Sequence, residues 1–160
     1  MSRYENELKR ILIGEGGDFL DRITKTLSEK EEEAYRLPLE KPYQVVRGAG
    51  SLGIDLTIMR GPFYLNLEVK SSKDSTILFS DHGNDEQLEE YKEAIEESHI
   101  PLAYPYRLKG RSGEKWRLFG VEPSYFYDQL PPLQETRQGN PKMVFEEGKP
   151  LSEFLIETLS

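Results

Sequence analysis

The clearest alternation of apolar and polar positions lies between residues 53 and 71, in two runs that Gly61 and Pro62 separate. A two-residue turn with glycine first suits a type II′ β-hairpin, and proline can follow it. Side chains alternate between the two faces of a strand, so the runs predict strands at 53–60 and 63–71. One face is expected to pack in the core, because it gathers Ile54, Leu56, Ile58, Leu65, Leu67 and Val69.

The rest of the chain switches between helical and extended patterns. Apolar residues with a 3.6-residue period predict helices at 3–13, 18–35, 85–98 and 151–159. Extended runs predict further strands at 43–48, 101–108, 115–122 and 142–146. Strands that alternate with helices, one of which is a crossover helix, predict an α/β fold with a mixed central β-sheet flanked by helices.

The polar face of the hairpin carries the candidate chemistry, because its turn places Asp55 opposite Glu68. Facing carboxylates repel each other, and a hard cation such as Mg²⁺ or Mn²⁺ removes that penalty by taking oxygen ligands. The Val69 carbonyl would be a further ligand, and Lys70 lies one pleat away. A metal here would activate a water molecule and neutralise charge on a phosphate. The alternative is a solvated polar face on which Lys70 pairs with Glu68 or Asp55.

Three motifs along the chain resemble one known family. They read ENEL at 5–8, VVRGAGSLGID at 45–55 and EVK at 68–70. Together they resemble the archaeal Holliday-junction resolvases, a branch of the PD-(D/E)xK nuclease superfamily. The resemblance covers most of the chain outside residues 14–42, and it implies a restriction-endonuclease-like fold.

The resemblance implies a role for each matched residue. Asp55 and Glu68 match metal ligands, Lys70 matches the catalytic lysine, and Glu5 matches a helix carboxylate that completes the metal site. The positions that would support the active site and the DNA backbone are Arg47, Gly50 and Ser51. Helical periodicity alone leaves both Glu5 and Glu7 at margins of the apolar stripe. The resemblance selects Glu5, and Glu7 is expected to stabilise the N-terminus of its helix.

The implied function is a structure-selective endonuclease that cuts four-way DNA junctions with a metal-activated water. Such an enzyme must cut two symmetry-related strands, so a C₂ homodimer is the expected assembly. Two alternatives remain open. One is another PD-(D/E)xK endonuclease, of restriction or homing type, which would read base edges. The other is a non-catalytic DNA-binding protein of the same fold.

Two features depart from the family pattern. Residues 14–42 form an insertion, expected to be mainly helical, and its acidic run at 29–33 is either a solvated face or a partner-binding surface. The net charge is −8, with 29 acidic and 21 basic residues, whereas proteins that grip duplex DNA are usually basic. The acidic stretch 85–97 should therefore face away from DNA. Lys73 and Arg111, the latter in a basic stretch at 107–117, are candidate phosphate contacts.

Chain length and composition favour a small intracellular enzyme. A chain of 160 residues suits a single nuclease domain spanning 1–160. No apolar run approaches the roughly 20 residues of a membrane span, and the N-terminus lacks an apolar signal segment. The chain has no cysteine, which excludes disulfides and thiolate chemistry. We therefore expect a cytoplasmic protein with no membrane partner, and the resemblance implies an archaeal or archaeal-virus source.

Overall fold

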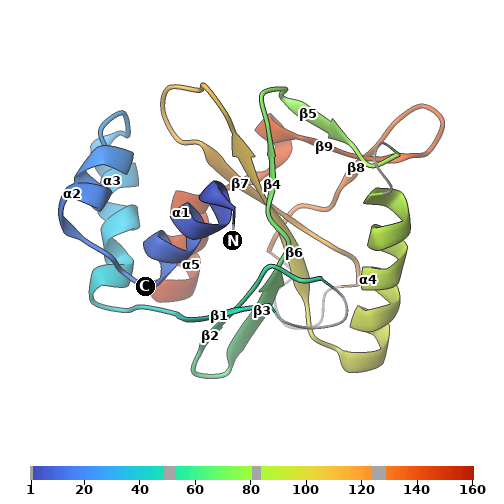
Figure 1. The fold of residues 1–160 in the computed structure, drawn as a ribbon, viewed down its shortest axis with the longest axis horizontal. Coiled ribbons are helices and arrows are strands. Elements are labelled where there is room, and N and C mark those ends of the chain that lie inside the picture. The colour runs from blue at the N-terminus through green and yellow to red at the C-terminus, as the bar shows by residue number, and fades with distance from the viewer. Residues whose placement is uncertain (1, 49–52, 81–83, 124–128) are drawn as a thin grey trace.

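A computed structural model describes residues 2–48, 53–80, 84–123 and 129–160. Its main sheet has the strand order β1-β2-β3-β6-β7-β10, and β4 pairs with β6 beyond the end of β3 (Figure 1). The sheet is mixed, since β3 and β4 run parallel to β6 while the other neighbours are antiparallel. Its strands are β1 (Gln44–Arg47), β2 (Leu56–Arg60), β3 (Phe63–Leu67), β4 (Lys70–Ser72), β6 (Leu102–Leu108), β7 (Trp116–Gly120) and β10 (Lys149–Pro150).

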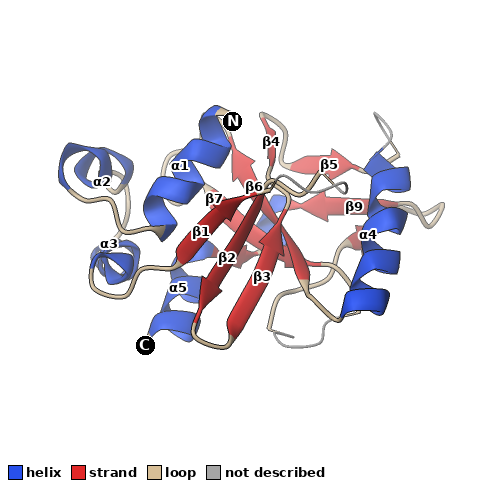
Figure 2. Ribbon diagram, turned by 60° about the horizontal axis from the view of Figure 1, so that its bottom comes forward, coloured by secondary structure: helices blue, strands red, loops and turns tan. Residues whose placement is uncertain are grey.

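Helices cover both faces of this sheet, as Figure 2 shows. The helices α1 (Arg3–Leu12) and α5 (Leu151–Leu159) supply apolar side chains to one core cluster, and α4 (Asn84–Ser98) supplies them to the other. Along β6, Ala103 belongs to the first cluster while its neighbours Leu102 and Tyr104 belong to the second. This alternation follows the strand period of two. The α/β class with a mixed central sheet and flanking helices, predicted from the sequence, is confirmed.

The hairpin has the predicted register. Leu56 lies opposite Leu67 and Arg60 opposite Phe63, and Gly61 takes a φ of 57° in the turn. The expected apolar face is buried at Leu56, Ile58, Leu65 and Leu67. Ile54 differs from the expectation: it precedes the regular part of β2 and packs against the α4 side instead.

The predicted strand 63–71 is wrong as a single element, because it is divided into β3 and β4. The cause lies on the neighbouring strand. Glu68 N–H donates to the Ala103 carbonyl at 3.0 Å, and in a parallel ladder the Glu68 carbonyl would then accept from residue 105. That residue is Pro105, which has no N–H, so the ladder is interrupted beside Glu68 and Val69.

The predicted helix 18–35 is also wrong as a single element. The chain forms α2 (Gly17–Ile23) and α3 (Glu29–Arg36), followed by the 3₁₀ turn η1 (Leu37–Leu39). The separation follows from Ser28, whose side chain accepts from Glu31 N–H while the Glu31 carboxylate accepts from Ser28 N–H. Such a capping box starts a new helix. The two ends of the insertion meet, because Tyr43 N–H donates to the Leu12 carbonyl at 3.0 Å.

A small second sheet was not predicted from the sequence. It has the order β5-β9-β8 and combines β5 (Thr76–Leu78), β8 (Gln134–Glu135) and β9 (Pro141–Val144). The expected strand at 142–146 overlaps β9, and its last residues form the 3₁₀ turn η2 (Phe145–Glu147). Within the described ranges, no helix is both long enough and apolar enough to cross a membrane.

Candidate active site

Asp55 lies just before β2 and Glu68 just after β3. The regular pairing ends at Leu56 and Leu67, and Asp55 N–H also donates to the Leu67 carbonyl at 3.1 Å, so the hairpin ladder is irregular at Asp55, where direct pairing with Glu68 was expected. The backbone of Gly48 presses on the same segment: its N–H donates to the Asp55 carbonyl at 2.8 Å. A Cβ added to Gly48 would lie 1.5 Å from the Ile54 carbonyl oxygen. Glycine at position 48 therefore allows the end of β1 to approach closely enough to hold Asp55 in place.

Each of the two carboxylates accepts one hydrogen bond from a fixed donor. The Asp55 Oδ2 accepts from Val69 N–H at 2.7 Å, at the point where Pro105 interrupts the ladder. The Glu68 Oε2 accepts from the hydroxyl of Tyr91 at 3.0 Å, and the Glu68 side chain is almost completely buried. These bonds orient both carboxylates from the backbone of one strand and the side of α4.

Burial and the neighbouring acids raise the pKa of both carboxyls. Burial, and then the neighbouring Glu5, raise the pKa of Asp55 to about 6. Burial, and then the charge of Asp55, raise the pKa of Glu68 to about 7. The Glu5 carboxyl is near enough to Asp55 to form a hydrogen bond when one of the two is protonated. The helix α1 thus brings Glu5, and not Glu7, to the hairpin acids.

Lys70 lies at the start of β4, beside these acids. Its Nζ donates to the side-chain oxygens of Asn84 at 3.0 Å and Gln87 at 3.4 Å, and it lies 5.8 Å from the centre of the Tyr104 ring. Burial lowers the pKa of Lys70, and the charge of Glu68 opposes that shift. The amide oxygens at the N-terminus of α4 therefore hold the ammonium group in a fixed position.

Glu7 has a different role from its neighbour two residues earlier. Its carboxylate accepts from Arg107 Nε at 2.8 Å and from the Trp116 indole N–H at 3.0 Å. The ion pair is mostly shielded, with side chains 10% and 18% exposed. Glu7 therefore ties α1 to β6 and β7, which differs from the expectation that it simply stabilises the helix end.

The remaining candidates lie around this centre. Arg47 is exposed at the end of β1, and Lys73 is exposed after β4. Arg111 donates to the Glu146 carboxylate and lies 4.9 Å from the centre of the Phe145 ring, so its charge is already paired. Gly50 and Ser51 lie outside the described residues.

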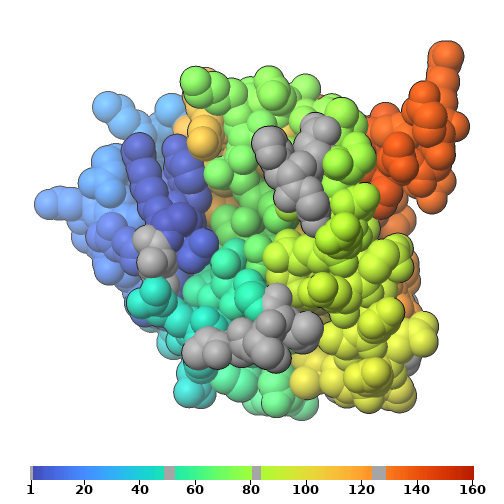
Figure 3. Space-filling view, turned by 45° about the vertical axis from the view of Figure 1, so that its right-hand side comes forward, coloured from blue at the N-terminus to red at the C-terminus, as the bar shows by residue number. Residues whose placement is uncertain are grey.

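Three contributors from α4 were missed as site residues in the sequence. Asn84, Gln87 and Tyr91 have the spacing i, i+3 and i+7, which places them on one face of a helix. That polar face, on a helix that also buries Leu88 and Ile95, was the available signal. Figure 3 shows α1 in dark blue and α4 in yellow-green on either side of the strands that carry the site.

The donor atoms gathered here are oxygens, which suits a hard divalent cation such as Mg²⁺ or Mn²⁺. The pKa values of Asp55 and Glu68 are raised first by burial and then by the neighbouring acids, and a bound cation would oppose both effects. Within the described part of the chain, no group of three or more His, Asp or Glu side chains is placed to hold a metal ion. A cation here would therefore also need a backbone carbonyl and water as ligands.

Comparison with known proteins gives a likeness among solved structures. No family model matches the chain, and no curated protein matches it. Among solved structures, that of Hjc, a Holliday junction resolvase from Archaeoglobus fulgidus, is similar with a TM-score of 0.47 and 23% identity. The match covers 71% of this chain and 81% of that one.

Proposed function

We propose that the protein is a metal-dependent endonuclease that hydrolyses phosphodiester bonds in DNA. The observation that carries the proposal is that the carboxyls of Asp55 and Glu68 lie close together beside Lys70, with Asp55 half-buried and Glu68 buried. A fold gains no stability from two facing acids, so their position favours a ligand that neutralises them. A cation held there also attracts a phosphate.

Mg²⁺ is the proposed cofactor, with Mn²⁺ as a substitute, and its ligands would be Glu5, Asp55, Glu68 and the Val69 carbonyl. When bound, such a cation lowers the pKa of a coordinated water and neutralises charge on the phosphate. Lys70, held by hydrogen bonds from its ammonium group to Asn84 and Gln87, would orient the attacking water or stabilise the phosphate as negative charge builds on it.

The surrounding residues prepare the carboxylates for this task. Tyr91 fixes one oxygen of Glu68, and its hydrogen bond also opposes the rise in the pKa of that acid. Val69 N–H does the same for Asp55. Both bonds keep the acids closer to the ionised form that a metal needs.

The proposed substrate is a four-way DNA junction, cut by a C₂ homodimer inside the cell. Support comes from the resemblance of residues 45–55 and 68–70 to archaeal Holliday-junction resolvases. Recognition would depend on branch shape and backbone contacts. The alternatives are an endonuclease of restriction or homing type and a non-catalytic DNA-binding protein.

The test is cleavage of a mobile four-way junction and of a linear duplex, with Mg²⁺ titrated, by wild type and by Asp55→Asn. The exposed Asp74→Asn is the matched control, because it removes the same charge outside the site. We expect junction cutting that is abolished in Asp55→Asn and kept in the control. Equal cutting by both variants would refute the role of Asp55. Cutting of linear duplex at one sequence would favour the restriction type, and absence of both cutting and calorimetric metal binding would favour the non-catalytic protein.

A further inference from the structure

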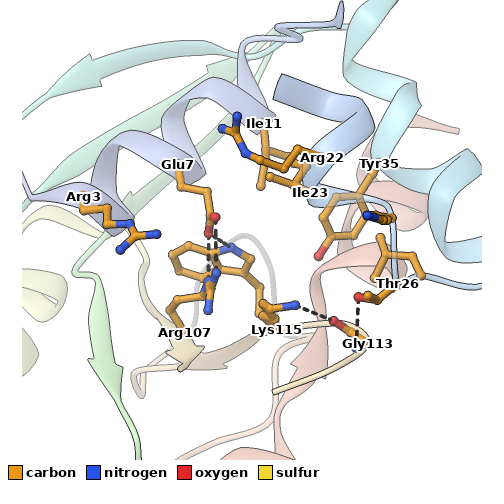
Figure 4. A pocket seen from close by; sticks show the side chains of 13 residues that line it. Arg3, Glu7, Ile11, Arg22, Ile23, Thr26, Tyr35, Arg107, Gly113 and Lys115 are labelled. Atoms are coloured by element: carbon orange, nitrogen blue, oxygen red, sulfur yellow. Dashed lines mark hydrogen bonds and ion pairs between the residues drawn. The ribbon is translucent and has the colours of Figure 1, made fainter. Parts of the chain in front are cut away.

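A pocket of about 250 Å³ lies on the side of α1 that carries Glu7, between that helix, the insertion and the β6–β7 hairpin (Figure 4). The loop between α2 and α3 forms one wall. Its Thr26 Oγ1 accepts from Gly113 N–H at 3.1 Å, which joins the insertion to the hairpin. The charged side chains that line the pocket are Arg3, Glu7, Arg22, Lys25, Arg107 and Lys115.

The lining has an excess of positive charge, with five cations and one acid. The acid is Glu7, and Arg107 and Trp116 already donate to it. The other four cations form no ion pair within the part of the chain that the structure describes. In a chain with a net charge of −8, basic residues gathered without acidic partners form an unusual local arrangement.

The crowding of positive charge in the pocket also affects Lys115. Burial lowers the pKa of Lys115, and the charge of Arg107 lowers it further. An anion in the pocket would offset both effects. The pocket also offers hydrogen-bond donors in the hydroxyl of Thr26 and the guanidinium of Arg3, both of which line the open space in Figure 4.

We propose that this pocket binds a phosphate group, and that the group belongs to the backbone of the DNA held at the Asp55–Glu68 site. The source of the phosphate rests on the proposed function; the anion-binding chemistry does not. Arginine and lysine side chains that converge from several elements recognise phosphate through charge and hydrogen bonds. The insertion would thereby extend the DNA contact beyond the reacting phosphate.

Helical geometry places the pocket relative to the acids. Glu5 and Glu7 are separated by about 200° around α1, since each residue turns the helix by about 100°. Glu5 meets Asp55, whereas Glu7 lines the pocket. The two sites therefore lie about one helix diameter apart, roughly 10 Å.

The test compares Arg22→Gln/Lys25→Gln with Arg137→Gln/Lys142→Gln. The first pair is exposed at the pocket. The second removes the same charges from the β8–β9 hairpin, which projects from the body of the molecule in Figure 3. Junction binding is measured by fluorescence anisotropy in EDTA over a range of salt concentrations. We expect weaker binding by the pocket variant and a slope of log K against log[salt] that is less steep by about 0.9, because one phosphate is no longer neutralised. The control should match wild type.

A second measurement distinguishes a DNA phosphate from a free phosphate compound. It also tests the phosphate site separately from the proposed nuclease function. Thermal unfolding of wild type and the pocket variant is followed with and without inorganic phosphate. Stabilisation by phosphate that wild type shows and the pocket variant does not supports the phosphate site. Equal salt slopes alongside that stabilisation would overturn the assignment of the phosphate to DNA and would leave a free phosphate compound as the ligand. Equal salt slopes together with no stabilisation by phosphate would overturn the inference. Failure of wild type to bind junctions would by itself count against the proposed function only.

Discussion

Substitution of Gly48 by alanine should separate Asp55 from its support. The new Cβ would lie 1.5 Å from the Ile54 carbonyl oxygen, whereas real Cβ contacts stay beyond 3.0 Å, so the two backbones must move apart by about 1.5 Å. The β1 strand is held by four residue pairs with β2, so the Ile54–Asp55 segment is expected to give way. The 2.8 Å hydrogen bond from Gly48 N–H to the Asp55 carbonyl then breaks.

A misplacement of about 1 Å at a reacting centre costs on the order of 100-fold in rate. We therefore expect Gly48→Ala to lower kcat for junction cleavage about 100-fold or more, equivalent to about 3 kcal/mol of barrier. Gly16→Ala is the control, because its nearest contact is a movable Leu39 methyl group at 3.2 Å. Circular dichroism would show whether both variants fold. A folded Gly48→Ala protein whose kcat stays within about threefold of wild type would refute the reasoning.

Three further predictions concern the acids. Glu7→Gln should lower the free energy of unfolding in urea by about 3 kcal/mol, because it breaks a shielded ion pair, and should leave calorimetric Mg²⁺ affinity unchanged. Glu5→Gln should do the reverse; similar effects of the two changes would contradict the assignment. Tyr91→Phe removes a hydrogen bond that lowers the pKa of Glu68, so the acidic limb of the pH–rate profile should move to higher pH; an unmoved limb would count against that contact. Because folding raises the pKa of Asp55 from 3.8 to about 6 and of Glu68 from 4.5 to about 7, the folded metal-free protein holds more protons, and its stability should fall as pH rises from about 4 to about 7. Asp55→Asn/Glu68→Gln should flatten that fall in urea titrations, and an equal fall in the double variant would refute the coupling.

The sequence predicted the features that neighbouring residues determine, and it did not predict those that depend on tertiary contacts. The hairpin register was predictable because Gly61 and Pro62 fixed a two-residue turn, and strand periodicity then paired Leu56 with Leu67. Asn84, Gln87 and Tyr91 were not identified as site residues because their role depends on how α4 docks against β4, which is a tertiary contact.

The two wrong boundaries have different causes. The break after Ile23 could have been predicted, since Ser28 and Glu31 have capping-box spacing. It was missed because the apolar residues keep a helical period across 18–35. The break between β3 and β4 was not readable from those residues, because it depends on Pro105 in a strand that pairs with them only in the fold. A proline acts on a ladder through its partner strand, so sequence neighbours carry no sign of it.

The hydrogen bond between Tyr43 and Leu12 makes the insertion a closed loop on an otherwise continuous scaffold. Loop-closure entropy grows only with the logarithm of loop length, so a longer or shorter segment between those two residues changes the cost of folding little. Phe19, Leu20 and Tyr35 of that loop pack in the core cluster that contains α1, so these positions are constrained, whereas its exposed positions are not. Under the proposed function, exposed insertion residues such as Arg22 and Lys25 can therefore vary to change the ligand contacts, while the acids on α1 and the hairpin stay as they are.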